Sequence, residues 1–571
     1  MSKKKSTTCN GRVGNRFTAH QFRRIGLSLP AMLAIAPAAH AFQLYNGNAH
    51  GNDLEVNLDI TTSYTGLFRV QQPSAILVSG ASNPNGNDGD ANLRHGVVGN
   101  TFEVLPVLDI KYDSFGMHFS GEYFINTVYL HSNQNNQPGS VNPVVTTNTN
   151  YANQTRTSNG TNGRMLDAFV YDSWHFAGGQ EFTLKAGQQT LFWGQSLFFG
   201  TNGIAGGQAP IDVVSASNLV NPQTQQIFLP VGQIVASYQP NDTYTIQGYY
   251  QYQWEPYALN GVGSYFSTSD VTGPGGYRLI AAGGADNSAF PGTGNFYLIK
   301  NGKDLTPPSQ NGQFGLSVQA QYGNYDVGLF GLRYDSKTPE VYINAPTGFT
   351  PTPGGTAVGQ YKLVYARDIW LYGTSLSTTI GATNVAGELS VRTHMPLVTG
   401  GGTQTPTDMG DANSNPLYPV GNTMTGLMSA IYGSPALRFD PGGITMTGEV
   451  EYVDVFRVTD NKDMLAPNRT ASAMAFDVEV VPAYFDVLPN LELTFPVSLL
   501  YNFVGNSRMD SSMNHGTGNW SVGVSATYRQ TWDATLSYVG YYGQVGTNGL
   551  APQIQPSADR GYLSLNLQHT F

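Results

Sequence analysis

The chain has 571 residues, of which only 12% are charged, about half the share that is usual in soluble domains. Asp and Glu (38) outnumber Lys and Arg (28), so nucleic acid is not expected as a partner. Beyond the first 41 residues no run of about 18 apolar residues occurs, which excludes membrane-spanning helices. The remainder is rich in neutral polar residues, with 67 Gly and 33 Tyr, as in strands with lipid on one side and water on the other.

The first 41 residues resemble an export leader. A basic region is followed by an apolar stretch over residues 25–39, and Ala39-His40-Ala41 forms a small-x-small cleavage site. We therefore predict a cleaved signal peptide over residues 1–41 and one mature domain over residues 42–571. General secretion is favoured, and Arg23-Arg24 leaves the twin-arginine route as the alternative. The single cysteine, Cys9, leaves with the leader, so no disulfide is expected.

Amphipathic strands recur along the mature chain. Apolar and polar residues alternate with a period of two, as in a strand whose faces meet different surroundings, in segments 54–61, 117–126, 244–254, 314–322 and 491–503. Short turns separate some of these segments, and long polar loops separate others. The long loops are predicted over residues 73–94, 131–163, 192–230, 255–312, 336–358, 394–442, 504–518 and 543–560.

This alternation of short turns and long loops predicts an all-β fold, a transmembrane antiparallel β-barrel of about 16–18 strands. Short turns would face the periplasm and long loops the exterior. The segmentation is ambiguous over residues 359–393, and a short helix is predicted at 423–432 inside the loop 394–442. A secreted propeller or β-helix is the alternative, but no fixed-period repeat supports it.

The last ten residues form one more amphipathic strand. Leu563, Leu565 and Leu567 alternate with polar residues, and the chain ends at Phe571. This pattern resembles the assembly signal of bacterial outer-membrane barrels. It predicts the barrel-assembly machinery as a partner through the C-terminal strand, and outer-membrane lipid and lipopolysaccharide as the surroundings of the wall.

Residues 191–214 are rich in glycine and aromatic residues, and Asp212 is their only charged residue. The segment is too apolar for a solvated loop and too rich in glycine for a plain strand. We predict a loop folded into the lumen, in which Trp193, Phe198, Phe199 and Asp212 are the candidate constriction residues. The alternative is a strand end and loop packed against the rim.

Charged residues within strands give candidates for the wall of a pore, because charge is costly against lipid. They are predicted to point into the lumen, and carboxylates dominate, so an open lumen would favour cations. The alternative is that they pair with one another or with an inserted loop. The candidates are Glu122, Glu388, Arg392, Glu449, Glu451, Asp477, Glu479 and Glu492.

No motif predicts an enzyme, a cofactor or a catalytic residue. The Asn and Asp residues of segment 83–90 supply oxygen atoms that suit Ca²⁺, but the EF-hand spacing is not met, so solvated turns are favoured over a metal site. We therefore expect no catalytic, cofactor or metal site.

Several stretches resemble a family of Gram-negative outer-membrane β-barrel proteins that is classified as a domain of unknown function. They are residues 88–90, 166–170, 191–213, 230–233 and 262–267. Members of this family are often encoded beside RND-type exporters. The resemblance implies an outer-membrane barrel that handles poorly soluble small molecules, with an RND-type export system as a further partner, and it carries over no catalytic residue.

Two functions fit these expectations. The first is an outer-membrane channel or transport protein for the passive passage of small solutes, hydrophobic ones included. The second is a barrel without transport that acts as a binding or structural protein of the envelope.

Overall fold

The computed structural model describes residues 42–47, 53–137, 147–220, 222–282, 295–300, 304–307, 312–344, 348, 350–352, 355–400, 403–404, 410–435, 442–545 and 555–571. The leader and cleavage site predicted for residues 1–41 lie outside these residues and stay predictions. In the described part of the chain, no helix is both long and apolar enough to cross a bilayer.

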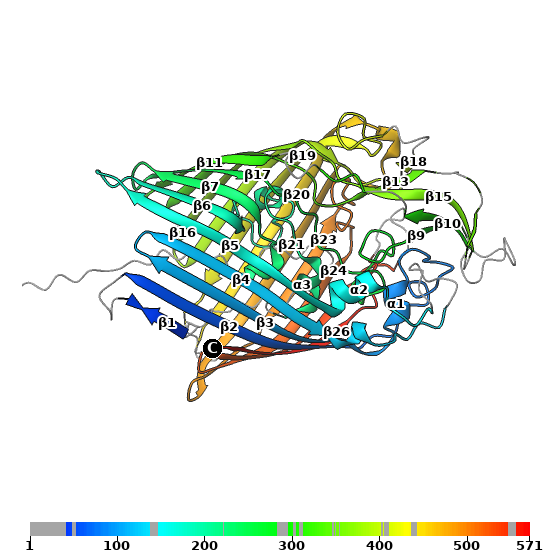
Figure 1. The fold of residues 1–571 in the computed structure, drawn as a ribbon, viewed down its shortest axis with the longest axis horizontal. Helices are drawn as coiled ribbons and strands as arrows, with labels where there is room; N and C mark the ends of the chain where they lie inside the picture. Colours follow the sequence, from blue (N-terminus) through cyan, green and yellow to red (C-terminus); the bar gives the residue numbers. More distant parts are fainter. Residues whose placement is uncertain are drawn as a thin grey trace, which may run out of the picture.

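The chain forms a closed antiparallel β-barrel of 18 strands (Figure 1), the upper of the two expected counts. Each wall strand pairs with its neighbour in sequence, and β22 and β23 form one wall strand that is interrupted at Phe495 and Pro496. The wall strands are β2 (Leu54–Arg69), β3 (Gly96–Tyr112), β4 (Phe115–Asn126), β5 (Thr161–His175), β6 (Glu181–Gln189), β7 (Val231–Gln239), β8 (Tyr244–Gln251), β11 (Gln313–Tyr322), β12 (Tyr325–Tyr334), β16 (Ile369–Ile380), β17 (Thr383–Pro396), β19 (Val420–Gly433), β20 (Ile444–Asp460), β21 (Ser472–Leu488), β22 (Leu491–Thr494), β23 (Val497–Val504), β24 (Gly518–Tyr528), β25 (Trp532–Tyr542) and β26 (Tyr562–Thr570).

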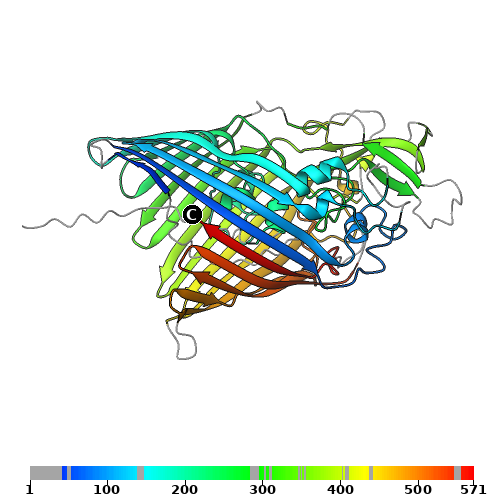
Figure 2. The same ribbon diagram turned by 60° about the horizontal axis from the view of Figure 1, so that its bottom comes forward.

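The first and last wall strands close the barrel. β26 pairs with β2 from Thr61 opposite Thr570 to Arg69 opposite Tyr562, and Figure 2 shows the red β26 beside the blue β2. The short strand β1 (Phe42–Asn46) then continues along the same edge of β2, beginning with Phe42 opposite Leu58. The predicted C-terminal strand therefore forms the closing seam, with Ser564 and Asn566 buried inside and the leucines outside.

The two rims of the barrel differ as predicted. One rim carries tight turns such as those between β3 and β4 and between β11 and β12. The opposite rim carries the long loops with a second, six-stranded sheet and short helices (Figure 1). These elements are β9 (Arg278–Ala282), β10 (Asn295–Lys300), β13 (Glu340–Asn344), β14 (Thr350–Thr352), β15 (Gly355–Val364), β18 (Thr403–Gln404), α1 (Asp88–Asn92), η2 (Thr127–Leu130), α2 (Asn153–Thr155), η3 (Arg156–Gly160) and η5 (Lys462–Met464).

The helix predicted at residues 423–432 is wrong, because this segment lies within wall strand β19. Thr423, Thr425 and Leu427 are buried toward the lumen, whereas the side chain of Met428 is 65% exposed outside. β19 pairs on both edges, with β17 and with β20. These two ladders outweigh the weak local helix preference of a segment that contains Met424, Leu427, Met428 and Ala430. The predicted loop 394–442 is correspondingly shorter and contains a wall strand.

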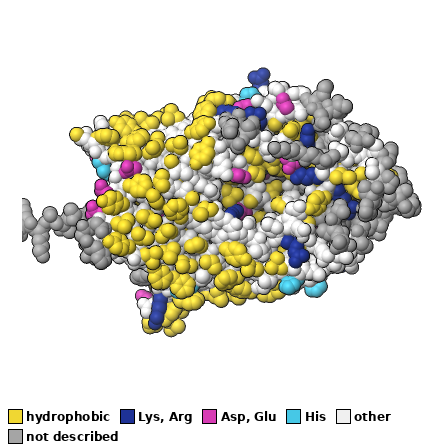
Figure 3. Space-filling model, viewed as in Figure 1, with side chains coloured by type: hydrophobic (Ala, Val, Ile, Leu, Met, Phe, Trp, Pro, Cys, Tyr) yellow, Lys and Arg dark blue, Asp and Glu magenta, His cyan; other side chains and the backbone are white. Residues whose placement is uncertain are grey.

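The outer face of the barrel is apolar. Leu316, Leu329 and Leu376 are 50–58% exposed, and Figure 3 shows hydrophobic side chains spread over the wall strands on this side. In water such an apolar surface would drive aggregation, whereas in lipid it is favourable. Because the barrel is closed, its wall strands pair their backbone N–H and C=O groups with one another and need no water. The wall therefore has the properties of a membrane-spanning barrel.

Candidate functional site

The chain between β6 and β7 lies inside the barrel. We call residues 190–230 the inserted segment; it contains the helices η4 (Ile204–Gly207), α3 (Val213–Asn218) and α4 (Thr224–Ile227). Gln189 and Val231 at its two ends are direct partners across β6 and β7. The segment therefore leaves the wall and returns to it at one place, and the wall remains continuous below it.

Two glutamates of the opposite wall hold the first part of the inserted segment. Glu449 on β20 accepts hydrogen bonds from the backbone N–H groups of Leu197, Phe198 and Phe199, with N···O distances of 3.0, 2.6 and 2.9 Å. Glu388 on β17 accepts from the N–H groups of Gln195 and Ile204, both at 2.8 Å. Because hydrogen bonds to a charged acceptor are stronger than neutral ones, these carboxylates fix the path of residues 195–204.

Glycine permits the close contact between the inserted segment and Glu388. A Cβ on Gly203 would overlap Glu388 Oε1, and a Cβ on Gly194, which has φ +99°, would overlap Glu388 Oε2. The carboxylate therefore reaches the backbone N–H groups only because side chains are absent at both positions. Arg392 on the same strand donates to the carbonyl oxygen of Gly203, which fixes the turn from the other side.

A second set of polar contacts holds the later part of the inserted segment. Arg164 on β5 forms ion pairs with Glu122, at 2.6 Å, and with Asp212. Asp212 also accepts from the N–H of Ser215 at 2.9 Å, which caps the first turn of α3. Gln226 on α4 donates to Glu122 at 3.2 Å and to Glu103 on β3. The segment is thus tied to β3, β4 and β5 as well as to β17 and β20.

Apolar packing accompanies these contacts. The ring of Trp193 lies 5.1 Å from that of Tyr249 and 5.8 Å from that of Phe330, and its Nε1 donates to Gln247 at 2.6 Å. Phe198 and Phe199 are fully buried in a cluster with Leu427 and other wall residues. Three of the four candidate constriction residues therefore pack the segment against the wall, and the fourth, Asp212, caps a helix within it. Their role as a constriction stays a prediction.

The eight candidate pore residues all lie on strand faces that point inward. Glu122, Glu388, Arg392 and Glu449 contact the inserted segment or Arg164, as described above. Glu451, Asp477 and Glu479 are buried on β20 and β21, where Glu449 and Asp477 are direct partners. Glu492 lies on β22, close to the rim with tight turns, and is partly buried. The wall opposite β5 therefore carries a concentration of carboxylates; whether they line a conducting path stays a prediction.

Lys337, in the loop that follows β12, reaches the inserted segment at η4. Its Nζ donates to the carbonyl oxygen of Gly207 at 3.1 Å and lies 5.2 Å from the centre of the Tyr334 ring. Burial lowers the pKa of Lys337 from 10.5 to about 7, because the charged form loses its hydration. The contact therefore changes its charge within the physiological range.

The first long loop is tied to the closing seam by a buried ion network. Asp90 on α1 contacts Arg69 at the end of β2 and Arg560 before β26, both at 2.9 Å. Asp559 contacts Arg69 at 3.2 Å. The carboxylate of Asp90 is thus engaged by two guanidinium groups. Within the described ranges, no three His, Cys, Asp or Glu residues form a group suited to a metal ion.

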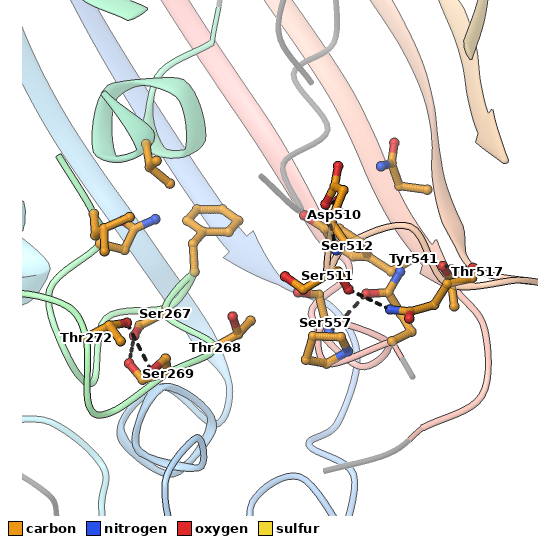
Figure 4. A pocket seen from close by; sticks show the side chains of 18 of the residues that line it. Ser267, Thr268, Ser269, Thr272, Asp510, Ser511, Ser512, Thr517, Tyr541 and Ser557 are labelled. Atoms are coloured by element: carbon orange, nitrogen blue, oxygen red, sulfur yellow. Dashed lines mark hydrogen bonds between the residues drawn. The ribbon is translucent and has the colours of Figure 1, made fainter. Parts of the chain in front are cut away.

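A cavity of about 360 Å³ remains between the inner loops and the wall on the side of β23, β24 and β25. One side is formed by α3 and residues 257–273, and the other by residues 500–519, Tyr541 and residues 555–557 (Figure 4). Such a volume lies within the range of small-molecule sites. The cavity and the inserted segment together define the candidate functional site.

Sequence reasoning missed several residues of this interior. Glu103 and Arg164 lie within wall strands, so the same test of charge within an alternating strand would have found them. Asp510, Asn519 and Lys337 carried no local signal. Their roles depend on which distant segments lie beside them.

One protein-family model matches nearly the whole chain. Residues 23–571 match the model of a family described as Protein of unknown function (DUF1302). Among curated protein sequences none matches the chain.

Several solved structures resemble the barrel. OccD3 (OpdP) of Pseudomonas aeruginosa is 10% identical, with a TM-score of 0.40 and coverage of 94% of both chains. OccAB1 of Acinetobacter baumannii is 9% identical, with a TM-score of 0.42 and coverage of 94% of this chain and 99% of that one. A BenF-like porin of Pseudomonas fluorescens Pf-5 is 10% identical, with a TM-score of 0.41 and coverage of 91% and 98%. At this level the likeness concerns the barrel alone, and nothing about substrates carries over.

Proposed function

Because the chain belongs to the family described as Protein of unknown function (DUF1302), we propose its function from its own geometry: a porin-like outer-membrane channel for the passive passage of small molecules, hydrophobic ones included. The observation that carries the proposal is the inserted segment. It is tied to β3, β4, β5, β17 and β20, while a cavity of about 360 Å³ remains at the side of β23 to β25. A barrel of this width holds more than packed side chains, so the remaining space offers a route for solutes.

The mechanism we propose is selection by size and polarity, with no covalent step. A solute would enter from the rim with the long loops, pass the cavity beside the inserted segment, and leave through the lumen below it. The inserted segment would act as the constriction, and the carboxylates of β17, β20 and β21 would favour cations over anions.

The partners of this channel are also part of the proposal. Lipid and lipopolysaccharide would contact the apolar wall, and the barrel-assembly machinery would recognise the C-terminal strand. An RND-type export system is a further proposed partner, which rests on the family resemblance.

The proposal is tested by single-channel conductance in a planar bilayer. The refolded protein is compared with a variant in which residues 190–230 are replaced by Asn-Gly. Gln189 and Val231 are direct partners, so a two-residue turn can join the two strands. We expect discrete conductance steps for the native chain and larger steps for the variant. In a KCl gradient, the sign of the reversal potential should show that K⁺ passes more readily than Cl⁻.

Folding of both proteins is checked by the change in gel mobility on heating. Equal conductance of the two proteins would overturn the constriction by the inserted segment. Silence of both folded proteins would overturn the channel and favour a binding or structural role in the envelope.

A further inference from the structure

Four basic side chains lie at the rim with the long loops, where three neighbouring wall strands end. We call them the basic cluster. They are Arg94 and His95 before β3, His131 after η2 at the end of β4, and Arg156 before β5. Because neighbouring strands lie about 4.8 Å apart, the basic cluster extends over about 10 Å along the rim.

Hydrogen bonds join the segments that carry the basic cluster. Oε1 of Gln134 accepts from the backbone N–H groups of Arg94 and His95 at 2.8 and 3.1 Å, and its Nε2 donates to the carbonyl oxygen of His95 at 3.0 Å. The guanidinium group of Arg156 donates to the carbonyl oxygen of Leu130 at 2.7 Å. The loop that follows η2 therefore holds the residues before β3 and those before β5 together.

The side chains of the basic cluster are accessible from outside. His95 and His131 are exposed, and Arg94 and Arg156 are partly exposed. The side chains of Arg94, His95 and His131 form no hydrogen bond or ion pair with the described residues. Their charge and their N–H groups can therefore serve a ligand that is not part of the chain.

The described segments around the basic cluster offer it no carboxylate. Neither Asp nor Glu occurs in residues 93–102, 126–137 and 147–163. The carboxylates of the adjoining loops and strands are at most 7% exposed; they belong to Asp88, Asp90, Glu103, Glu122, Asp270 and Asp559. An anion that approaches from outside therefore meets positive charge and N–H donors without repulsion by an exposed carboxylate of these segments.

The wall beside the basic cluster is apolar. Phe102 on β3, Tyr123 on β4 and Met165 on β5 point outward and are 47–55% exposed. Figure 3 shows Lys or Arg and His side chains beside hydrophobic ones at the lower right of the barrel. An anionic lipid fits both features, because its headgroup meets the basic cluster while its acyl chains lie along the apolar strands.

We propose that the basic cluster and the outer face of β3, β4 and β5 bind an outer-leaflet lipid with two phosphate groups on a disaccharide headgroup, the chemistry of lipopolysaccharide. Arg94 and Arg156 pair with the phosphates, since guanidinium groups form bidentate bonds with phosphate oxygens. His95 and His131 donate further hydrogen bonds. This inference rests on the outer-membrane location within the proposed function and is independent of conduction.

The test uses two lipids with the same acyl chains, diphosphoryl lipid A and monophosphoryl lipid A. Binding of each to the protein in an uncharged maltoside detergent is measured by native mass spectrometry. EDTA is present, so that no divalent metal ion bridges lipid and protein. We expect about fivefold tighter binding of the diphosphoryl form, the effect of one basic contact with an anionic headgroup, and a smaller difference at high ionic strength. Inorganic phosphate at the same concentration should not displace the lipid.

Variants test the basic cluster itself. Arg94→Gln removes a charge whose side chain has no described contact within the protein, and we expect about fivefold weaker binding of diphosphoryl lipid A. Arg94→Lys keeps the charge and should retain most of the binding. Arg529→Gln makes the same chemical change on an exposed residue in the tight turn between β24 and β25 at the opposite rim, and it should leave binding unchanged. Folding of each variant is checked by gel mobility.

The outcomes separate this site from the channel. Equal binding of both lipids, unaltered binding to folded Arg94→Gln, or an equal loss in Arg529→Gln would overturn the site. Displacement by inorganic phosphate would overturn a lipid as the ligand. A silent bilayer with phosphate-dependent binding of lipid A would overturn the channel and leave the lipid site standing. Conductance without phosphate-dependent binding would overturn the lipid site and leave the channel standing.

Discussion

Replacement of Glu449 by Gln should release the inserted segment from the wall. The carboxylate accepts three backbone hydrogen bonds, two of them at Oε2. Gln keeps one acceptor oxygen but presents an NH₂ group to the remaining donors, so at least one charge-assisted bond is lost and two donors face each other. Because hydrogen bonds to charged groups contribute about 1.5–3 kcal/mol each, we expect docking of residues 195–199 to weaken by about 2–4 kcal/mol.

This loss corresponds to a population of the detached segment that is about 30-fold to 1,000-fold larger, since a tenfold change corresponds to about 1.4 kcal/mol. Hydrogen exchange measured by mass spectrometry should therefore show faster exchange at Leu197, Phe198 and Phe199. In a bilayer, the current of the variant should fluctuate between the native level and a larger one.

Glu492→Gln is the matched control. It removes one inward carboxylate from β22 without changing any hydrogen bond of the inserted segment described above. Its cation preference should fall slightly, whereas the exchange of residues 197–199 should stay at the native rate. Native exchange rates in folded Glu449→Gln would refute the reasoning that this carboxylate holds the segment.

Three further predictions concern the rims and the seam. Asp90→Asn leaves Arg69 and Arg560 with one buried carboxylate fewer. Because breaking a buried ion pair is destabilising by about 3–5 kcal/mol, the temperature at which the barrel loses its folded gel mobility should fall. An unchanged temperature would contradict a structural role of the network. For Lys337 the pKa of about 7 in the folded state lies below its ordinary value of 10.5, so the unfolded chain binds more protons between these values and the folded state gains stability as pH rises from about 7 towards 10. Lys337→Met should remove that part of the pH dependence, measured as the difference in unfolding temperature between pH 7 and pH 9. The same difference in the native chain and in Lys337→Met would contradict a contribution of Lys337 to the pH dependence. The N–H of Phe571 donates to the carbonyl oxygen of Ile60 at 3.0 Å beside the closing seam. Deletion of Phe571 should lower the amount of barrel assembled in outer membranes, measured as heat-modifiable protein in membrane fractions. Native amounts would argue against its role as an assembly signal.

The local pattern of the sequence was sufficient for the wall. A period of two depends only on neighbouring residues, so the inward Ser564 and Asn566 and the outward leucines of β26 could be read directly. A charged residue within such a strand must face the lumen, because charge is costly against lipid. This argument placed Glu388 and Glu449 on the correct face. The order of short and long connections then predicted the two rims and a count of about 16–18 strands, of which the structure has 18.

Local pattern failed where pairing partners decide the conformation. Residues 423–432 resemble a helix by composition, but two neighbouring strands hold them extended. The sequence also left open whether the residues after Leu191 fold into the lumen or along the rim, because both environments accept apolar and glycine residues. Contacts with Glu388 and Glu449, which lie 193 and 251 positions from their partners Gln195 and Phe198, place the segment in the lumen.

The interior of the barrel was determined only by the tertiary structure. Asp90 and Arg560 are 470 positions apart, and the barrel brings them together because its last strand closes on its first. Asp510 and Asn519 likewise line a cavity with residues of the inner loop that are more than 200 positions away. Alternation in the sequence determines which side of the wall a residue faces, whereas barrel closure and the path of the inserted segment determine what that residue meets there.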